Sequence, residues 1–320
     1  MAVVLLATVH VVKAQAQLAP EVAGAAEARM RETIETLCAS DKNGRGPGSK
    51  GLLLALDYIT DSFRRVSVAP AGHDGTMFQF FTPAPTEIHG TFKLPEGQSW
   101  GRITLANIVG VLPARTTGAP CIVICAHYDH LGQTVTLADY PGADDNASGV
   151  AVLLELARRM RRTGPFHNAV IFAAFSGKEQ GALGAKHYLA NPLCRVERTV
   201  AVLNLDTVGR MEGKKLFVSG TGTAVEFPEI VDGVNLGLGL ELVTSAGAAP
   251  SSDQVPFYEK GVPALHLSTG QGAHYRQTTD TPDKLNYPGL AAVADFAWEM
   301  AVHLAEREEP LSLVPAGSGK

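Results

Sequence analysis

The order of apolar and polar positions predicts strands that alternate with helices. Apolar runs, typical of strands covered on both faces, occur at residues 121–125 and 169–175, and a third at 200–205 is interrupted only by Asn204. Apolar residues recur every three or four positions after Ser148 and in the segment 288–305, which predicts amphipathic helices. Further helices are predicted at 25–38, 51–63, 181–189 and 227–236, and further strands at 77–82, 103–112, 215–219 and 264–268. This alternation indicates an α/β sheet with helices on both faces.

Side chains that can bind a metal ion or take part in catalysis follow three of the buried strands. His127, Glu179 and Asp206 each come shortly after the end of such a strand. Open α/β sheets place their sites at the carboxyl ends of the strands, so we expect these three side chains to lie close together.

Composition narrows the classes of function. The chain has 320 residues, 45% hydrophobic and 18% charged, which is close to average for a globular protein. Its net charge of −5 and the lack of a basic stripe argue against a nucleic-acid partner, and no polybasic segment points to a membrane surface. Cys121 and Cys125 would lie about 13 Å apart on one face of a strand, too far to form a disulfide, so we expect free cysteines.

The first residues form an apolar run that ends in Ala14-Gln15-Ala16, a small-x-small sequence typical of signal-peptide cleavage. We predict a signal peptide over residues 1–16 and a periplasmic or extracellular protein. The alternatives are a first buried element or a translation start placed too early, and the protein would be cytoplasmic if the segment is not cleaved. The run is too short to span a bilayer, so no membrane association is expected after processing. Residues 17–309 are predicted to form one domain and residues 310–320 a flexible tail.

A His-x-Asp sequence and an Asp-Asp pair predict a zinc site. The imidazole of His127 suits Zn²⁺, and Asp129 can accept the other ring N–H and fix the tautomer. Asp144, in a Gly-rich loop, would bridge two ions, with Glu179 and Asp206 supplying one carboxylate ligand to each. Two ions about 3.5–4 Å apart would hold a water molecule and polarise a substrate carbonyl.

Short motifs extend this pattern over nearly the whole chain after residue 16. They lie at residues 40–41, 44–51, 106–110, 126–132, 142–149, 175–181, 204–210, 252–254 and 280–284. In these motifs the chain resembles the aminopeptidase S/aminopeptidase Y family of co-catalytic zinc peptidases, whose members resemble bacterial leucyl aminopeptidase.

The resemblance implies a three-layer α/β/α sandwich with a mixed, mostly parallel central sheet. It also implies an exopeptidase, most simply an aminopeptidase, that hydrolyses N-terminal residues of peptides through a metal-bound hydroxide. Two zinc ions are expected: His127 and Asp206 on one, Glu179 and a late histidine on the other, and Asp144 between them. A cis peptide between Asp144 and Asp145 is expected as well. The stretch 82–104 is too short for the protease-associated insert that the family often carries.

The chain departs from the family pattern at the position of the general base. The family has Gly-Glu-Glu where this chain has Gly177-Lys178-Glu179. An ammonium of ordinary pKa, about 10.4, cannot accept a proton at neutral pH, although a nearby zinc ion would lower that pKa. Three roles stay open for Lys178: it acts as the catalytic base, it orients the substrate, or it points away from the site.

A second departure concerns the last metal ligand. The family places a histidine four residues before an aspartate, and counting back from Asp280 gives Arg276, which cannot bind a metal. His274 stands two positions earlier, and we predict that a shift of the loop makes it the ligand. Tyr275 can stabilise an oxyanion or serve in packing, and Asp145 is expected to orient a ligand or the loop.

Both departures add a cation where a second metal ion and the base are expected. Lys178 and Arg276 can therefore replace the charge of one zinc ion and pair with Glu179, which would leave one zinc or none. A rival hypothesis is a family member that has lost activity and binds peptides or acts as a scaffold. A third is a single-zinc acyltransferase resembling glutaminyl cyclases, but such an enzyme also needs an acidic residue at the position of Lys178.

Overall fold

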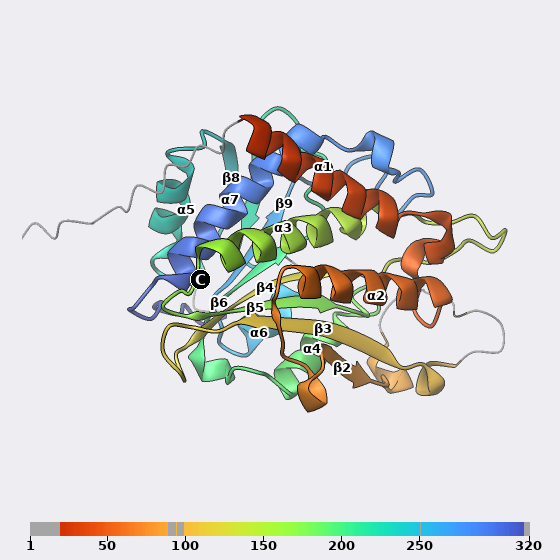
Figure 1. Ribbon diagram of the computed structural model, residues 1–320, viewed down its shortest axis with the longest axis horizontal. Helices are drawn as coiled ribbons and strands as arrows, with labels where there is room; N and C mark the ends of the chain where they lie inside the picture. The colour runs from red at the N-terminus through yellow and green to blue at the C-terminus, as the bar shows by residue number, and fades with distance from the viewer. Residues whose placement is uncertain (1–19, 89–93, 95–98, 250, 317–320) are drawn as a thin grey trace, which may run out of the picture.

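A sheet of nine strands runs through the residues described by the computed structural model, which are 20–88, 94, 99–249 and 251–316 (Figure 1). The strands lie in the order β1-β3-β5-β4-β6-β9-β7-β8, and β2 pairs with β3. Their bounds are β1 Ala69–Pro70, β2 Phe78–Phe81, β3 Leu105–Leu112, β4 Cys121–His127, β5 Ala169–Phe175, β6 Thr199–Leu205, β7 Lys215–Ser219, β8 Glu241–Ser245 and β9 Ala264–Ser268.

The four central strands β5, β4, β6 and β9 are parallel, so their carboxyl ends meet at one edge of the sheet. On one side β3 joins β5 antiparallel, and on the other β7 joins β9 antiparallel. The mixed sheet predicted from the resemblance is therefore confirmed, with the parallel strands at its centre.

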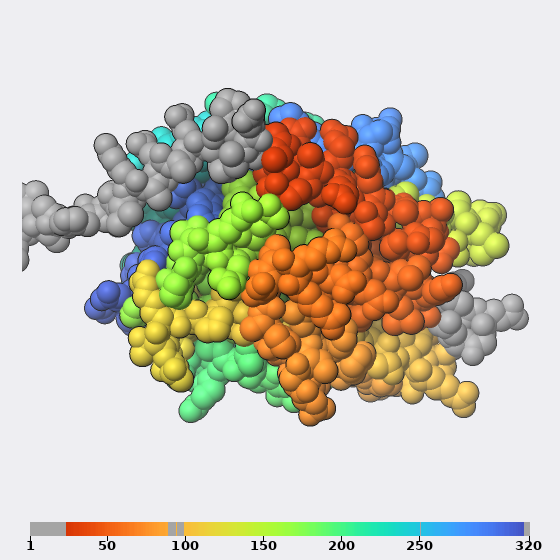
Figure 2. All heavy atoms as spheres, in the orientation of Figure 1, coloured from red at the N-terminus to blue at the C-terminus, as the bar shows by residue number. Residues whose placement is uncertain are grey.

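Helices cover both faces of the sheet, which confirms the three-layer sandwich (Figure 1). Helices α1, α2, α3 and α7 pack over one face, and Figure 2 shows α1 and α2 in red to orange beside the green α3. Helices α4 and α6 pack over the other face, while α5 packs against α7. The bounds are α1 Pro20–Leu37, α2 Lys50–Arg65, α3 Ser148–Thr163, α4 Leu183–Ala190, α5 Phe227–Asn235, α6 Gln254–Glu259 and α7 Tyr287–Ala305.

Side chains along the central strands alternate between two hydrophobic cores, as the period of two in a strand requires. In β4, Ile122 and Ile124 belong to the core beneath α3 and α7, whereas Cys121, Val123 and Cys125 belong to the core beneath α4 and α6. The two cysteines share a face as predicted, and the cysteines of the described residues are all free. Both faces of the strand are buried, which explains its continuous apolar sequence.

Arg45 holds the loops at the carboxyl edge of the sheet together. Its side chain is fully buried and donates hydrogen bonds to the backbone carbonyls of Leu37, Tyr128, Pro141 and Gly142. One side chain thereby joins the end of α1, the loop after β4 and the turn before α3.

The end of the described chain is docked on the domain. Leu311 is buried, Leu313 forms a bridge with Ala224, and Ser312 donates to the carboxylate of Glu226. The prediction of a flexible tail from residue 310 is therefore not met over residues 311–314. The predicted signal peptide lies outside the described residues and stays a prediction. Within the part of the chain that the structure describes, no helix has both the length and the apolarity needed to cross a membrane.

Candidate metal centre

Four loops bring acidic and imidazole groups together at the carboxyl edge of the parallel strands. His127 is the last residue of β4, and Asp206 directly follows β6. Glu179 lies in the turn after β5, and Asp145 lies in the tight turn that precedes α3. The fold thus brings His127, Glu179 and Asp206 to one edge, as expected from the order of strands, and adds Asp145 to them.

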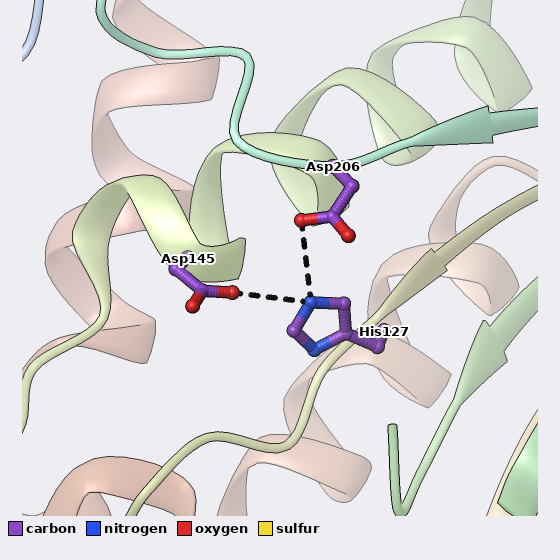
Figure 3. Close-up of side chains that lie close together, drawn as sticks. All are labelled: His127, Asp145 and Asp206. Carbon is purple, nitrogen blue, oxygen red and sulfur yellow. Dashed lines mark ion pairs between the residues drawn. The ribbon is translucent and has the colours of Figure 1, made fainter. Parts of the chain in front are cut away.

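His127 faces two carboxylates with one ring nitrogen (Figure 3). Its Nε2 lies 3.2 Å from Oδ1 of Asp145 and 3.5 Å from Oδ1 of Asp206. These three atoms are buried and make no hydrogen bond. Buried polar atoms are nearly always satisfied in native structures, so three unsatisfied atoms that converge on one point indicate a place for a cation.

A second group shares Asp145 with the first. Nδ1 of His130 lies 3.8 Å from Oδ2 of Asp145 and 3.7 Å from Oε1 of Glu179. The ring is buried, and neither of its nitrogens has a hydrogen-bond partner. The sequence offered one signal for His130, its place three residues after His127, but we did not predict it to be a ligand.

Lys178 points into the cluster. Its Nζ lies 3.4 Å from Oδ2 of Asp206, 3.7 Å from Oδ1 of Asp145 and 3.8 Å from Oε1 of Glu179. Burial lowers the pKa of Lys178, but these carboxylates outweigh burial and raise it well above its ordinary value. Of the three roles left open for Lys178, pointing away is therefore excluded, and an ammonium held by three carboxylates is poorly placed to accept a proton.

Positively charged neighbours also shift the pKa values of the carboxylates. Burial alone would raise the pKa of Asp206, but Lys178 and His127 hold that pKa well below its ordinary value. Burial likewise opposes ionisation of Glu179, and Lys178 lowers its pKa. Both carboxylates are thus held as anions, the form that binds a metal ion.

Arg276 lies at the position counted from the family pattern. Its guanidinium bonds to Oε2 of Glu179 and lies 3.9 Å from Oδ2 of Asp145. It also lies 5.3 Å from the centre of the ring of Tyr275, within the range of a cation–π contact. Burial, followed by the charge of Asp145, raises the pKa of Tyr275 to about 12, so its hydroxyl keeps its proton and stays a donor.

Asp144, predicted to bridge two ions, lies outside this cluster. Its Oδ1 accepts hydrogen bonds from the backbone N–H of Gly209 at 2.7 Å and from Oγ of Ser148 at 3.4 Å, and its Oδ2 lies 3.6 Å from Nε of Arg210. The residue that faces both groups is Asp145, and the cis peptide joins Asp145 to Asn146. The sequence interpretation was therefore displaced by one residue, both for the bridge and for the cis bond.

The structure also differs from the predicted place of His274. Its side chain is half-buried and lies away from both groups, with Nδ1 2.8 Å from Oγ1 of Thr279. His274 does not belong to either group of candidate ligands, and it is Arg276 that lies beside Glu179.

Asp129 supports the cluster through its backbone as well as its carboxylate. Its carbonyl oxygen lies 3.0 Å from Nδ1 of His127, closer than its carboxylate at 3.8 Å. The carboxylate instead accepts the backbone N–H groups of Lys178 at 3.2 Å and Glu179 at 3.4 Å. Asp129 thus fixes both the ring of His127 and the turn after β5.

One buried acidic group near the site was not among the predicted residues. Asp253 is fully buried, and its two carboxylate oxygens have no hydrogen-bond partner. Burial raises its pKa to about 7, although the charges of His127 and Lys178 oppose that shift. It was visible in the sequence only as part of the motif at residues 252–254.

Comparisons with known proteins agree on one family and one fold. Residues 107–301 match the model of peptidase family M28. Aminopeptidase YwaD of Bacillus subtilis is 32% identical over 174 residues, which are 52% of this chain and 36% of YwaD, so the match spans only about a third of that relative.

Solved structures at low identity show the same fold. BSAP, a zinc aminopeptidase from Bacillus subtilis, superposes with a TM-score of 0.70 at 19% identity, over 88% of this chain and 95% of BSAP. A glutaminyl cyclase from Porphyromonas gingivalis superposes with a TM-score of 0.63 at 21% identity, over 87% of this chain and 97% of the cyclase.

Proposed function

Because the chain belongs to peptidase family M28, we propose that it is a zinc-dependent exopeptidase that removes N-terminal residues from peptides. The observation that carries this proposal is the convergence of buried, unsatisfied atoms of His127, Asp145 and Asp206 at the carboxyl edge of the sheet. The names of similar proteins support it, since YwaD is called an aminopeptidase and BSAP a zinc aminopeptidase.

The group around His127 fits a zinc ion in its chemistry and its spacing. Two ligand atoms that each lie about 2.0–2.1 Å from a tetrahedral ion are about 3.3–3.4 Å apart. The separations of 3.2 and 3.5 Å between Nε2 of His127 and the oxygens of Asp145 and Asp206 bracket that value. Three protein ligands leave a fourth position open, as in catalytic sites, where the ion would polarise a peptide carbonyl and acidify a water molecule.

The chain's own residues orient this centre. With Nδ1–H of His127 donating a hydrogen bond to the backbone carbonyl of Asp129, Nε2 would present its lone pair to a bound ion. The carboxylate of Asp129 accepts hydrogen bonds from the backbone N–H groups of Lys178 and Glu179, which fixes the turn beside the group that would hold the ion. The side chains around the site are therefore pre-positioned, which lowers the cost of binding substrate in a reactive geometry.

A second candidate function is the binding of peptides without cleavage, and Lys178 is the observation that favours it. The family pattern places a glutamate base there, whereas this chain places an ammonium within 3.8 Å of three carboxylates. General-base help is typically worth about 10²–10⁴-fold in rate, so a site without a base would turn over slowly.

Hydrolysis of aminoacyl-p-nitroanilides separates the two candidates. We expect the purified chain to release nitroaniline when zinc is supplied, and to lose that activity with a chelator or in His127→Ala. Inactive wild type together with an active Lys178→Glu variant would favour peptide binding without cleavage. Inactivity of both, with intact folding by circular dichroism, would contradict the peptidase proposal.

We also propose that the protein works outside the cytoplasm, on the strength of the apolar run that ends in Ala14-Gln15-Ala16. Peptides are the expected partners in that compartment. Mass spectrometry of the protein from its native host tests this, since cleavage after Ala16 would leave Gln17 as the first residue. An intact N-terminus on the cell-associated protein would contradict it.

A further inference from the structure

Two positively charged side chains contact the carboxylates that would have to bind a second metal ion. Arg276 bonds to Glu179, and Lys178 lies 3.8 Å from the other oxygen of that carboxylate. Both cations also reach Asp145, at 3.9 Å from Oδ2 and 3.7 Å from Oδ1 respectively. Each oxygen of Asp145 and of Glu179 therefore already faces a positive charge supplied by the chain.

We infer that Lys178 and Arg276 take the place of a second metal ion, so that this chain binds one divalent ion where its family pattern implies two. The first ion is the zinc of the proposed function, at His127, Asp145 and Asp206, and the inference rests on that proposal. The second group, around His130 and Glu179, is then closed by the chain's own cations.

The charges of the cluster support a single ion. Asp145, Glu179 and Asp206 supply three negative charges, and Lys178 with Arg276 supplies two positive ones. One divalent ion changes the net charge from minus one to plus one, and a second ion would raise it to plus three. Lys178 and the three carboxylates are buried, so little water screens the repulsion between Lys178 and added ions, whereas Arg276 is partly exposed and contributes less.

The available ligands point the same way. The family's last histidine is Arg276 here, and a guanidinium neither donates a lone pair nor loses its proton. His130 is the imidazole left on this side, and its Nδ1 lies 3.7 and 3.8 Å from the nearest carboxylate oxygens. Those separations exceed the 3.2 and 3.5 Å of the His127 group and the spacing of about 3.3–3.4 Å for a tetrahedral zinc. A second ion would have to contract this group and displace the guanidinium from Glu179.

The ammonium and the guanidinium act together in this arrangement. Arg276 stands where the family has a histidine ligand, and its charge balances that of Glu179. The ammonium of Lys178 lies between the carboxylates of Glu179, Asp145 and Asp206. Restoring only the histidine would leave the ammonium beside the second group. Both positions must therefore change before a second ion binds with an affinity comparable to that of the first.

Metal stoichiometry tests the inference without reference to activity. The full chain, Arg276→His, and the double variant Lys178→Glu with Arg276→His would be equilibrated with Zn²⁺, passed through a desalting column and analysed for zinc per protein. We expect one ion for the wild type and for the single variant, and two for the double variant. Electron paramagnetic resonance of Mn²⁺-loaded samples gives a second readout, with spin-coupled manganese expected in the double variant alone.

Matched controls locate the single ion. Arg276→Lys keeps the cation and is expected to retain one zinc, His130→Ala likewise, whereas His127→Ala is expected to retain none. Two zinc ions in the wild type, or coupled manganese in it, would overturn the inference and leave the proposed function standing.

The remaining outcomes are equally decisive. A wild type without zinc would overturn both this inference and the zinc-dependent function. One zinc without hydrolysis would support the inference and contradict the peptidase proposal. A double variant that folds, as judged by circular dichroism and its melting temperature, but still binds one ion would show that Lys178 and Arg276 are not what excludes the second.

Discussion

Asp144 and Asp145 are neighbours in one turn, yet their carboxylates meet opposite surroundings. The carboxylate of Asp144 accepts the backbone N–H of Gly209 and lies 3.6 Å from the guanidinium of Arg210. Both oxygens of Asp145 lack a hydrogen bond, and one of them lies 3.2 Å from Nε2 of His127. Within a single turn, the carboxylate of Asp144 is used in hydrogen bonds that stabilise the fold, and the carboxylate of Asp145 is left available to a ligand.

Electrostatics separates the two residues in the same way. Burial, together with the charge of Asp280, raises the pKa of Asp144 to about 7. Burial also opposes ionisation of Asp145, but Lys178 and His127 outweigh it and lower the pKa of Asp145 below its ordinary range. Hydrogen bonding thus distinguishes a structural carboxylate from a candidate ligand more reliably than burial does, since both side chains are buried.

The largest effect is expected from Asp145→Asn. This change removes a charged ligand from the His127 group, and it weakens the second group as well. Loss of a residue that merely supports a ligand costs about 10–100-fold in metal affinity, so loss of this ligand should cost at least about 100-fold. Competition for Zn²⁺ with a chromophoric chelator measures the dissociation constant. Unchanged affinity would show that Asp145 does not bind the ion.

Much of this site could be predicted from sequence because it depends on strand order. The apolar runs that became β4, β5 and β6 placed His127, Glu179 and Asp206 at one sheet edge, and the structure brings these side chains together. Three elements were missed because their sequences lack a periodic signal, and one of them, strand β1, has only two residues. Strand β8 is an exposed edge strand with little apolar alternation, and helix α6 is short and contains Pro256.

The sequence pattern could not show which of two adjacent aspartates faces the metal site. The direction in which Asp144 and Asp145 point is set by the backbone of a turn, where no period of two or 3.6 applies. Counting from Asp280 did locate Arg276 correctly, since its guanidinium lies beside Glu179. The expected shift of the loop in favour of His274 is not seen, since Nδ1 of His274 contacts Oγ1 of Thr279 instead.

An intermediate effect is expected from Arg45→Met, which should disturb the turn that carries both Asp144 and Asp145. Arg45 donates to the carbonyls of Pro141 and Gly142, which lead into the turn that carries Asp144 and Asp145. Methionine has a similar length but leaves buried carbonyl groups without donors, at a cost of about 2 kcal/mol or more in the free energy of unfolding. Denaturation in urea measures this loss. A change below about 0.5 kcal/mol would mean that water replaces the guanidinium.

The smallest effect is expected from Asp144→Asn, the matched control for Asp145→Asn. The amide oxygen can still accept the N–H of Gly209, and the raised pKa of Asp144 shows that its negative charge is already disfavoured at this place. We therefore expect a change of less than about 1 kcal/mol in the free energy of unfolding, and zinc affinity within about threefold of the wild type. Equal losses of zinc affinity in the two variants would erase the distinction between these neighbours and return the bridging role to Asp144. A loss confined to Asp145→Asn would assign the metal to the carboxylate that the fold leaves unsatisfied.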